Sequence, residues 1–272
     1  MSSSPKPTFV LVPGAWHNAS VWDKVSAQLT ERGYKCVAIT LPSTTGDAAA
    51  TFLDDVTAAR TAIEAETASG NDVIVVVHSY GGLVGVSAVR GFTRKPHSGP
   101  ASRNATEPHG NVIGVALMAT GFAIEGMSML DGNNGQPPPQ WVINEETGFA
   151  DIVVDARDMM YHDLPEDEGQ EWVSKLEKQS VHALQKGGEH VYAGWQDVPC
   201  WYLVTEQDHA LPPAMQEYLV KMVVGQGADV TQKGVQASHS PMLSRPDETV
   251  QFLMDAMEDM VKKDTPVAAA TN

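Results

Sequence analysis

Residues 73–82, VIVVVHSYGG, decide the fold of this 272-residue chain. The five branched apolar residues at its start predict a strand that is buried on both faces of a parallel sheet. The run stops at His78, and Ser79 is followed by Tyr80 and two glycines. This junction is either an ordinary turn with a solvated serine or a tight turn that presents a nucleophile.

Short apolar runs alternate with amphipathic stretches of helical length on both sides of this segment. That pattern is typical of a sheet covered by helices on both faces. We expect helices over residues 20–32, 50–69 and 246–263, and strands over residues 9–12, 36–41, 73–78, 112–119, 200–205 and 229–234. The chain is therefore predicted to have an α/β fold with a mostly parallel sheet of about six strands flanked by helices.

The alternation is interrupted over residues 122–198. An irregular stretch there, GMSMLDGNNGQPPPQW, precedes helical patterns around residues 151–161 and 165–179. We expect this segment to be a helical cap inserted into a core made of residues 1–121 and 199–272. Residues 93–110, rich in Pro, Ser, Gly and charge, are predicted to be a mobile surface loop, and the tail after Asp264 to be frayed.

Composition excludes several classes of partner. The chain has 34 acidic and 18 basic side chains, a formal net charge of −16, which repels nucleic acid and anionic lipid. No apolar run is long enough to cross a bilayer, and no leader-like apolar stretch opens the chain, so we expect a cytoplasmic protein. Cys36 and Cys200 are expected to be reduced core residues. No metal-ligand spacing and no cofactor motif occurs, and the choice between monomer and homodimer stays open.

Chemically active side chains follow the predicted strands. Ligands of parallel sheets bind at the carboxyl ends of the strands, where Ser79, Asp208 and His239 appear in that chain order. A serine needs a histidine to accept its proton, and the histidine needs a carboxylate to hold its tautomer. The motif G-x-S-x-G marks the tight turn that carries such a serine, but Val77 replaces its first glycine here.

Other side chains compete for these roles. Glu206 and Asp197 are the alternatives to Asp208 as the acid. Among nine histidines, only His239 lies between the last predicted strand and the terminal helix, where this chain order requires the base. The other histidines near the predicted site, expected to be packing or supporting groups, are His17, His78 and His209.

Four segments resemble the α/β-hydrolase superfamily across nearly the whole chain: FVLVPGAWHNASVW, VVHSYGG, LVTEQDHALPPAMQ and ASHSPMLSRPDE. They are most similar to plant methyl-ester esterases, plant hydroxynitrile lyases and their esterase-like bacterial and fungal relatives. The resemblance implies that Ser79 is the nucleophile, Asp208 the acid and His239 the base. It also implies an oxyanion hole made by the backbone N–H groups of Tyr80 and Ala15, although Pro13 stands where relatives often have histidine.

The resemblance also bears on the reaction. Epoxide hydrolases and dehalogenases of this fold use an aspartate nucleophile, and Ser79 argues against them. The similar hydroxynitrile lyases carry threonine at the place of Gly14 and lysine at the place of Ser240, so an esterase is favoured. We expect hydrolysis of a small to medium apolar ester or lactone in a site lined by Trp16, His17, Phe122, Met127, Trp141 and Trp195. The alternatives are a lyase, isomerase or C–C cleaving enzyme with the same triad, and a non-catalytic ligand receptor.

Overall fold

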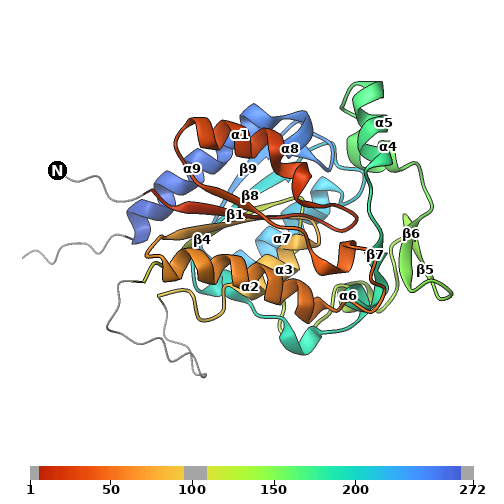
Figure 1. Ribbon diagram of the computed structural model, residues 1–272, viewed down its shortest axis with the longest axis horizontal. Coiled ribbons are helices and arrows are strands. Elements are labelled where there is room, and N and C mark those ends of the chain that lie inside the picture. The colour runs from red at the N-terminus through yellow and green to blue at the C-terminus, as the bar shows by residue number, and fades with distance from the viewer. Residues whose placement is uncertain (1–5, 95–108, 265–272) are drawn as a thin grey trace, which may run out of the picture.

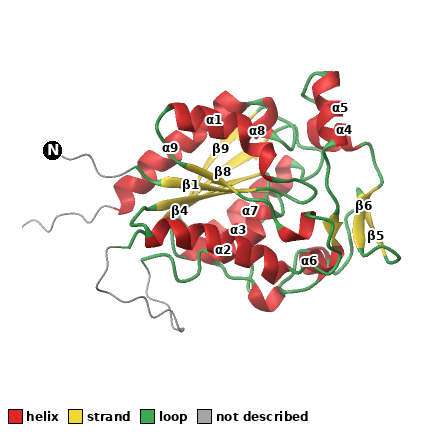
Figure 2. Cartoon of the chain, viewed as in Figure 1, coloured by secondary structure: helices red, strands yellow, loops and turns green. Residues whose placement is uncertain are grey.

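Six parallel strands form the central sheet of the computed structural model, which describes residues 6–94 and 109–264. Their spatial order is β2-β1-β3-β4-β8-β9, and Figure 2 shows the sheet in yellow between two layers of helices. The strands are β1 (Thr8–Val12), β2 (Cys36–Ala38), β3 (Val73–His78), β4 (Val112–Met118), β8 (Cys200–Thr205) and β9 (Val230–Val235). The α/β fold with six parallel strands is thus confirmed.

The helices lie on both faces of this sheet (Figure 1). On one face, α1 (Asp23–Glu31) packs against α9 (Pro246–Asp264). The other face is covered by α2 (Phe52–Ala68), α3 (Gly81–Ala88) and α7 (Pro213–Val224). The strand β3 lies between the two layers, and each of its residues is buried, as expected for branched apolar side chains in a sheet covered on both faces.

Local signals explain where several elements begin and end. Thr51 and Asp54 form a reciprocal capping box at the start of α2. Gly33 adopts φ 78°, a left-handed conformation that glycine reaches at little cost, and so ends the α1 region.

The strand predicted over residues 36–41 ends early at Ala38, because the chain turns into the 3-10 helix η2 (Pro42–Thr44). The helix predicted over residues 20–32 begins as the 3-10 helix η1 (Ala19–Trp22).

The segment between β4 and β8 contains more than helices. Three strands, β5 (Trp141–Asn144), β6 (Phe149–Ile152) and β7 (Gln179–Ser180), form a small antiparallel sheet. The helical pattern expected over residues 151–161 was wrong in its first part, because β6 pairs with β5 across a turn that contains Gly148. The remaining elements are η3 (Asp131–Asn133), α4 (Ala156–Tyr161), α5 (Glu166–Ser174), α6 (Val181–Gln185), η4 (Gly188–His190) and η5 (Gly194–Gln196).

Figure 1 shows four elements of this segment, α4, α5, β5 and β6, at the right-hand end of the molecule. The short helix α8 (Pro241–Ser244) joins the loop after β9 to α9.

Cys36 is half-buried and Cys200 buried, and both are free thiols. Within the described ranges, no helix is long and apolar enough to cross a membrane. Most of the loop predicted over residues 93–110, and the tail predicted to fray, lie outside the described residues.

Candidate active site

Ser79 occupies a strained turn between β3 and α3. Its φ is 51°, a left-handed conformation that costs a non-glycine residue about 1–3 kcal/mol. Two hydrogen bonds fix its backbone: the Ser79 N–H donates to the Met118 carbonyl at 3.2 Å, and the Thr120 hydroxyl donates to the Ser79 carbonyl at 2.6 Å. A Cβ on Gly81 would collide with the Pro13 carbonyl, and one on Gly82 with the Thr120 hydroxyl. The two glycines are therefore needed for this close approach.

A compensating glycine accommodates Val77, which replaces the first glycine of the nucleophile motif. Gly85, on the next turn of α3, faces the Val77 side chain, and a Cβ added there would overlap Val77 Cγ1. The same Cβ would lie 3.2 Å from Val75 Cγ1. In the G-x-S-x-G motif, the first glycine leaves space between the strand and the helix. Here Gly85 on the helix leaves that space instead, so Val77 does not prevent the tight turn.

Replacing Gly85 with alanine is expected to destabilise the protein by about 1–3 kcal/mol through overpacking. At an ordinary helix position the same substitution would stabilise the protein by up to about 1 kcal/mol. The sign of the change in unfolding free energy therefore shows whether Gly85 is needed for the contact with Val77. Urea unfolding gives the free energy difference. Val77→Ala should recover most of it in the double variant, and additive effects of the two substitutions would contradict the direct contact.

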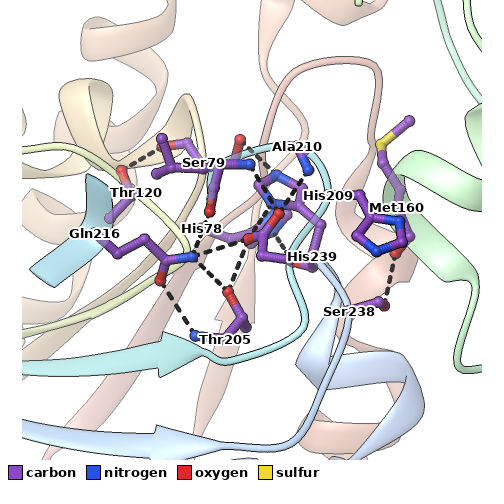
Figure 3. Close-up of polar contacts among 12 residues, drawn as sticks. His78, Ser79, Thr120, Met160, Thr205, His209, Ala210, Gln216, Ser238 and His239 are labelled. Carbon is purple, nitrogen blue, oxygen red and sulfur yellow. Dashed lines mark hydrogen bonds and ion pairs between the residues drawn. The ribbon is translucent and has the colours of Figure 1, made fainter. Parts of the chain in front are cut away.

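The side chains of Ser79, His239 and Asp208 form one hydrogen-bonded chain, although they come from three distant segments. Figure 3 shows Ser79 and His239 of this chain. His239 Nε2 lies 3.0 Å from Ser79 Oγ, and His239 Nδ1 lies 2.8 Å from Asp208 Oδ2. Asp208 and His239 are buried, with 4% and 5% of their surfaces exposed, whereas Ser79 is half-buried. In this arrangement the imidazole can take a proton from the serine hydroxyl while the carboxylate holds its tautomer.

Asp208 accepts hydrogen bonds at both carboxylate oxygens. Its Oδ1 receives two backbone N–H groups at 2.8 Å each, and its Oδ2 receives three side chains. Burial opposes ionisation, but the His239 charge and these hydrogen bonds outweigh it and lower the pKa of Asp208 below its ordinary value of 3.8. The donors are Ala210 and Leu211 through the backbone, and Thr205, Gln216 and His239 through side chains.

Gln216 was not singled out by the sequence reasoning. It is fully buried on α7, and its Nε2 donates to Asp208 Oδ2 at 3.0 Å and to the Thr205 hydroxyl at 2.8 Å. The competing carboxylates lie elsewhere: Glu206 is exposed near Gln236, and Asp197 accepts from the Tyr192 hydroxyl. A helix that begins five residues after Asp208 was the only available signal for Gln216.

Two backbone N–H groups near Ser79 are available to a ligand. Neither the N–H of Tyr80 nor that of Ala15 has a hydrogen-bond partner within residues 6–94 and 109–264, although both residues are buried. Tyr80 directly follows Ser79, and the adjoining Gly14 packs against the Ser79 side chain, where an added Cβ would come within 2.9 Å of Ser79 Cβ. Unpaired buried donors are rare in proteins, and beside a serine they suit an oxyanion.

Two more histidines pack beside His239. The ring of His78 lies 4.8 Å from that of His239, and the His17 ring lies 6.0 Å from His78. Burial lowers the pKa of His17 to about 4 and that of His78 well below 6.5, so both rings are neutral at pH 7. His78 Nε2 donates to the His239 carbonyl at 2.8 Å. His209 is exposed and contacts Asp158 instead.

The aromatic residues predicted to bind substrate fall into two pairs. Trp16 and Trp141 meet edge to face at 6.0 Å, and Phe122 and Trp195 do so at 6.3 Å. Phe122, Trp141 and Trp195 are buried in the core cluster, and the half-buried Trp16 packs against it. Met127 is half-buried in the loop before η3.

Two surface hollows have linings that do not include the triad. One of about 440 Å³ lies along α2, and another of about 460 Å³ lies beside α6. Within the described part of the chain, no group of three or more histidine, cysteine or carboxylate side chains has the geometry of a metal site.

Comparisons with known proteins identify the family to which the chain is similar. The model of the alpha/beta hydrolase family matches residues 9–252. The chain is 31% identical over 265 residues to alpha/beta hydrolase nvfD of Aspergillus novofumigatus, covering 94% of this chain and 99% of that protein. It is 27% identical over 266 residues to norfluorocurarine synthase 2 of Strychnos sp, covering 93% and 96% of the two chains.

Solved structures share the fold at low sequence identity. Tomato methylketone synthase I superposes with a TM-score of 0.72 at 16% identity, over 94% of this chain and 100% of that one. Polyneuridine aldehyde esterase gives a TM-score of 0.71 at 19% identity, over 93% and 99% of the two chains. At these identities the likeness is one of fold.

Proposed function

The chain belongs to the alpha/beta hydrolase family, and we propose that it is a serine hydrolase that cleaves a carboxylic ester or lactone of a small to medium apolar substrate. The observation that carries this proposal is the hydrogen-bonded chain from Ser79 through His239 to Asp208, with two unpaired N–H groups beside it. An acyl-transfer reaction uses each of these groups.

In the proposed reaction, Ser79 Oγ forms a bond to the carbonyl carbon while His239 Nε2 takes the hydroxyl proton. The carbonyl oxygen becomes negative and accepts hydrogen bonds from the N–H groups of Tyr80 and Ala15, a contribution of about 3 kcal/mol for each donor. Collapse of this intermediate breaks the bond to the alkoxy group, which takes the proton from His239. Water, deprotonated by His239, then releases the acid and regenerates Ser79.

The surroundings of Ser79 support an uncharged, apolar substrate. His17 and His78 are neutral at pH 7, and the aromatic residues Trp16 and Trp141 stand at the loop that carries Ala15. We propose that residues 122–198 act as the cap over this site and supply the remaining substrate contacts. The name of polyneuridine aldehyde esterase, which shares the fold, fits ester cleavage.

A second candidate is a lyase or C–C cleaving reaction at the same triad. The names of norfluorocurarine synthase 2 and methylketone synthase I, which are not those of ester hydrolases, leave room for such a reaction. The residue after the base is Ser240, which carries no charge to stabilise a departing cyanide, so cyanohydrin cleavage is the least suited of these reactions.

Labelling with a fluorophosphonate tests the nucleophile directly. The wild-type protein should be labelled at Ser79, as mapped by mass spectrometry, and the His239→Ala variant should not. Turnover of a panel of chromogenic esters and lactones then separates ester hydrolysis from the second candidate. Absence of label in both proteins would contradict the proposal, and tight ligand binding without turnover would indicate a receptor.

A further inference from the structure

Tyr161, the last residue of α4, reaches the loop that carries Ala15. Its hydroxyl lies 2.5 Å from His17 Nε2, and the other ring nitrogen of His17, Nδ1, lies 2.7 Å from the Ala15 carbonyl oxygen. Tyr161 is fully buried, and only 4% of the surface of His17 is exposed. A chain of two hydrogen bonds thus links the segment between β4 and β8 to the residue whose N–H is unpaired beside Ser79.

The direction of these hydrogen bonds follows from the groups themselves. A carbonyl only accepts, so His17 Nδ1 carries the ring proton and donates it to Ala15. In a neutral ring Nε2 is then an acceptor, and Tyr161 donates its hydroxyl proton to it. Burial lowers the pKa of His17 to about 4 and raises that of Tyr161, so neither group changes its protonation near pH 7. A single tautomer of His17 results.

The backbone held by this chain is under strain. Trp16, the residue after Ala15, adopts φ 60°, which a bulky side chain disfavours. Its carbonyl accepts from the Glu177 N–H at 2.8 Å, and its indole N–H donates to the Ala150 carbonyl at 2.9 Å. A left-handed residue beside an unpaired N–H persists only where the surroundings determine it, and these surroundings come from residues 149–177.

We propose that Tyr161 is a positioning residue for the oxyanion hole: through His17 it holds the Ala15 carbonyl, and so restrains the adjoining peptide that carries the Ala15 N–H beside Ser79. The inference rests on the proposed function, because an oxyanion hole has a role only if Ser79 attacks a carbonyl group. The neighbouring residue Met160 holds the base loop in a similar way, since its carbonyl accepts the Ser238 hydroxyl at 2.9 Å (Figure 3). Helix α4 therefore supports two of the catalytic loops.

Tyr161→Phe isolates the hydroxyl because it keeps the buried ring. We expect kcat to fall about 10- to 100-fold with little change in KM, as is common when a supporting hydrogen bond of a site is lost. Tyr192→Phe is the matched control: it removes the same atom from the same segment, where the hydroxyl donates to Asp197 at 2.8 Å, and should leave kcat unchanged.

A trifluoromethyl ketone distinguishes positioning from packing. Ser79 Oγ adds to its carbonyl carbon, the proton passes to His239, and the oxygen becomes the anion that the oxyanion hole binds. Its inhibition constant should weaken in Tyr161→Phe by the factor lost from kcat, whereas a non-reactive alcohol analogue should inhibit as before. Unchanged affinity for the ketone, at a lowered melting temperature, would overturn the inference.

His17 supplies a second test in case Tyr161→Phe does not fold. Asparagine at position 17 keeps an N–H near Nδ1, so His17→Asn should retain more activity than His17→Leu. Equal activities of these two variants would also count against the inference. If the wild-type protein itself forms no adduct with the ketone or the fluorophosphonate, the proposed function fails; an adduct equally stable in all variants contradicts only the role of Tyr161.

Discussion

Replacing Ser79 with alanine is expected to lower kcat for the best ester substrate about 10⁶-fold, the loss typical of a serine protease that is deprived of its nucleophile. The substitution removes the hydroxyl that lies 3.0 Å from His239 Nε2, on the turn where Ser79 has φ 51°. Initial rates over a range of substrate concentrations measure the effect. The strained backbone does not depend on the hydroxyl, so the variant should remain folded by circular dichroism.

The first control for this prediction compares the loss in kcat of the double variant with the losses of the two single variants. His239→Ala should cost about as much as Ser79→Ala, and the double variant should lose little more, because the two residues act as one unit. Ser26→Ala removes a hydroxyl on α1 that has no partner within the described residues and should leave turnover intact. Retained ester hydrolysis in Ser79→Ala would show that the nucleophile is another group.

Asp208→Asn is expected to lower kcat about 10⁴-fold while the fold persists. Each oxygen of the carboxylate accepts donors, two on Oδ1 and three on Oδ2. If the NH₂ of the asparagine takes the place of Oδ2, it faces the His239 Nδ1–H, donor against donor, and favours the wrong tautomer of His239. If the amide is turned the other way, its NH₂ takes the place of Oδ1 and faces two backbone N–H donors instead. Rates measured with the same esters give the loss, and fluorophosphonate labelling should slow in proportion.

The same substitution should change the dependence of stability on pH. Because the pKa of Asp208 is lower in the folded state than its ordinary value of 3.8, its ionisation stabilises the protein above that value. This contribution is lost as the pH falls through the folded-state pKa. The free energy of unfolding of Asp208→Asn should therefore differ most from the wild type at neutral pH and least in acid. A difference that grows as the pH falls would contradict the sign of the shift.

Much of the fold could be predicted because the strands are strongly patterned. Residues 73–78 and 200–205 were predicted with the bounds that the structure shows, since both strands are buried throughout. The hairpin of β5 and β6 was missed because only Trp141, Phe149 and Ala150 are buried there, so its pattern is weak. Short strands in a mostly exposed segment depend on pairing partners that a sequence does not display.

Part of the site could likewise be predicted from the sequence, and part could not. Chain order and position after a strand selected Ser79, Asp208 and His239, and in the structure the ring of His239 lies within hydrogen-bond distance of both other side chains. Gly85 and Gln216 could not be selected in this way, because their importance arises from contacts across the fold. An interior glycine and a helical glutamine have many ordinary explanations until their neighbours are known.

The strand order β2-β1-β3-β4-β8-β9 has a consequence for how activity is acquired during folding. Ser79, the proposed nucleophile, follows the central strand β3, whereas His239, the proposed base, follows the edge strand β9. Parallel pairing between distant segments is slow, because long loops must close before the contacts form. Enzymatic activity therefore reports docking of the final strand, and a nascent chain that has already built β1, β3 and β4 still lacks the imidazole needed to react.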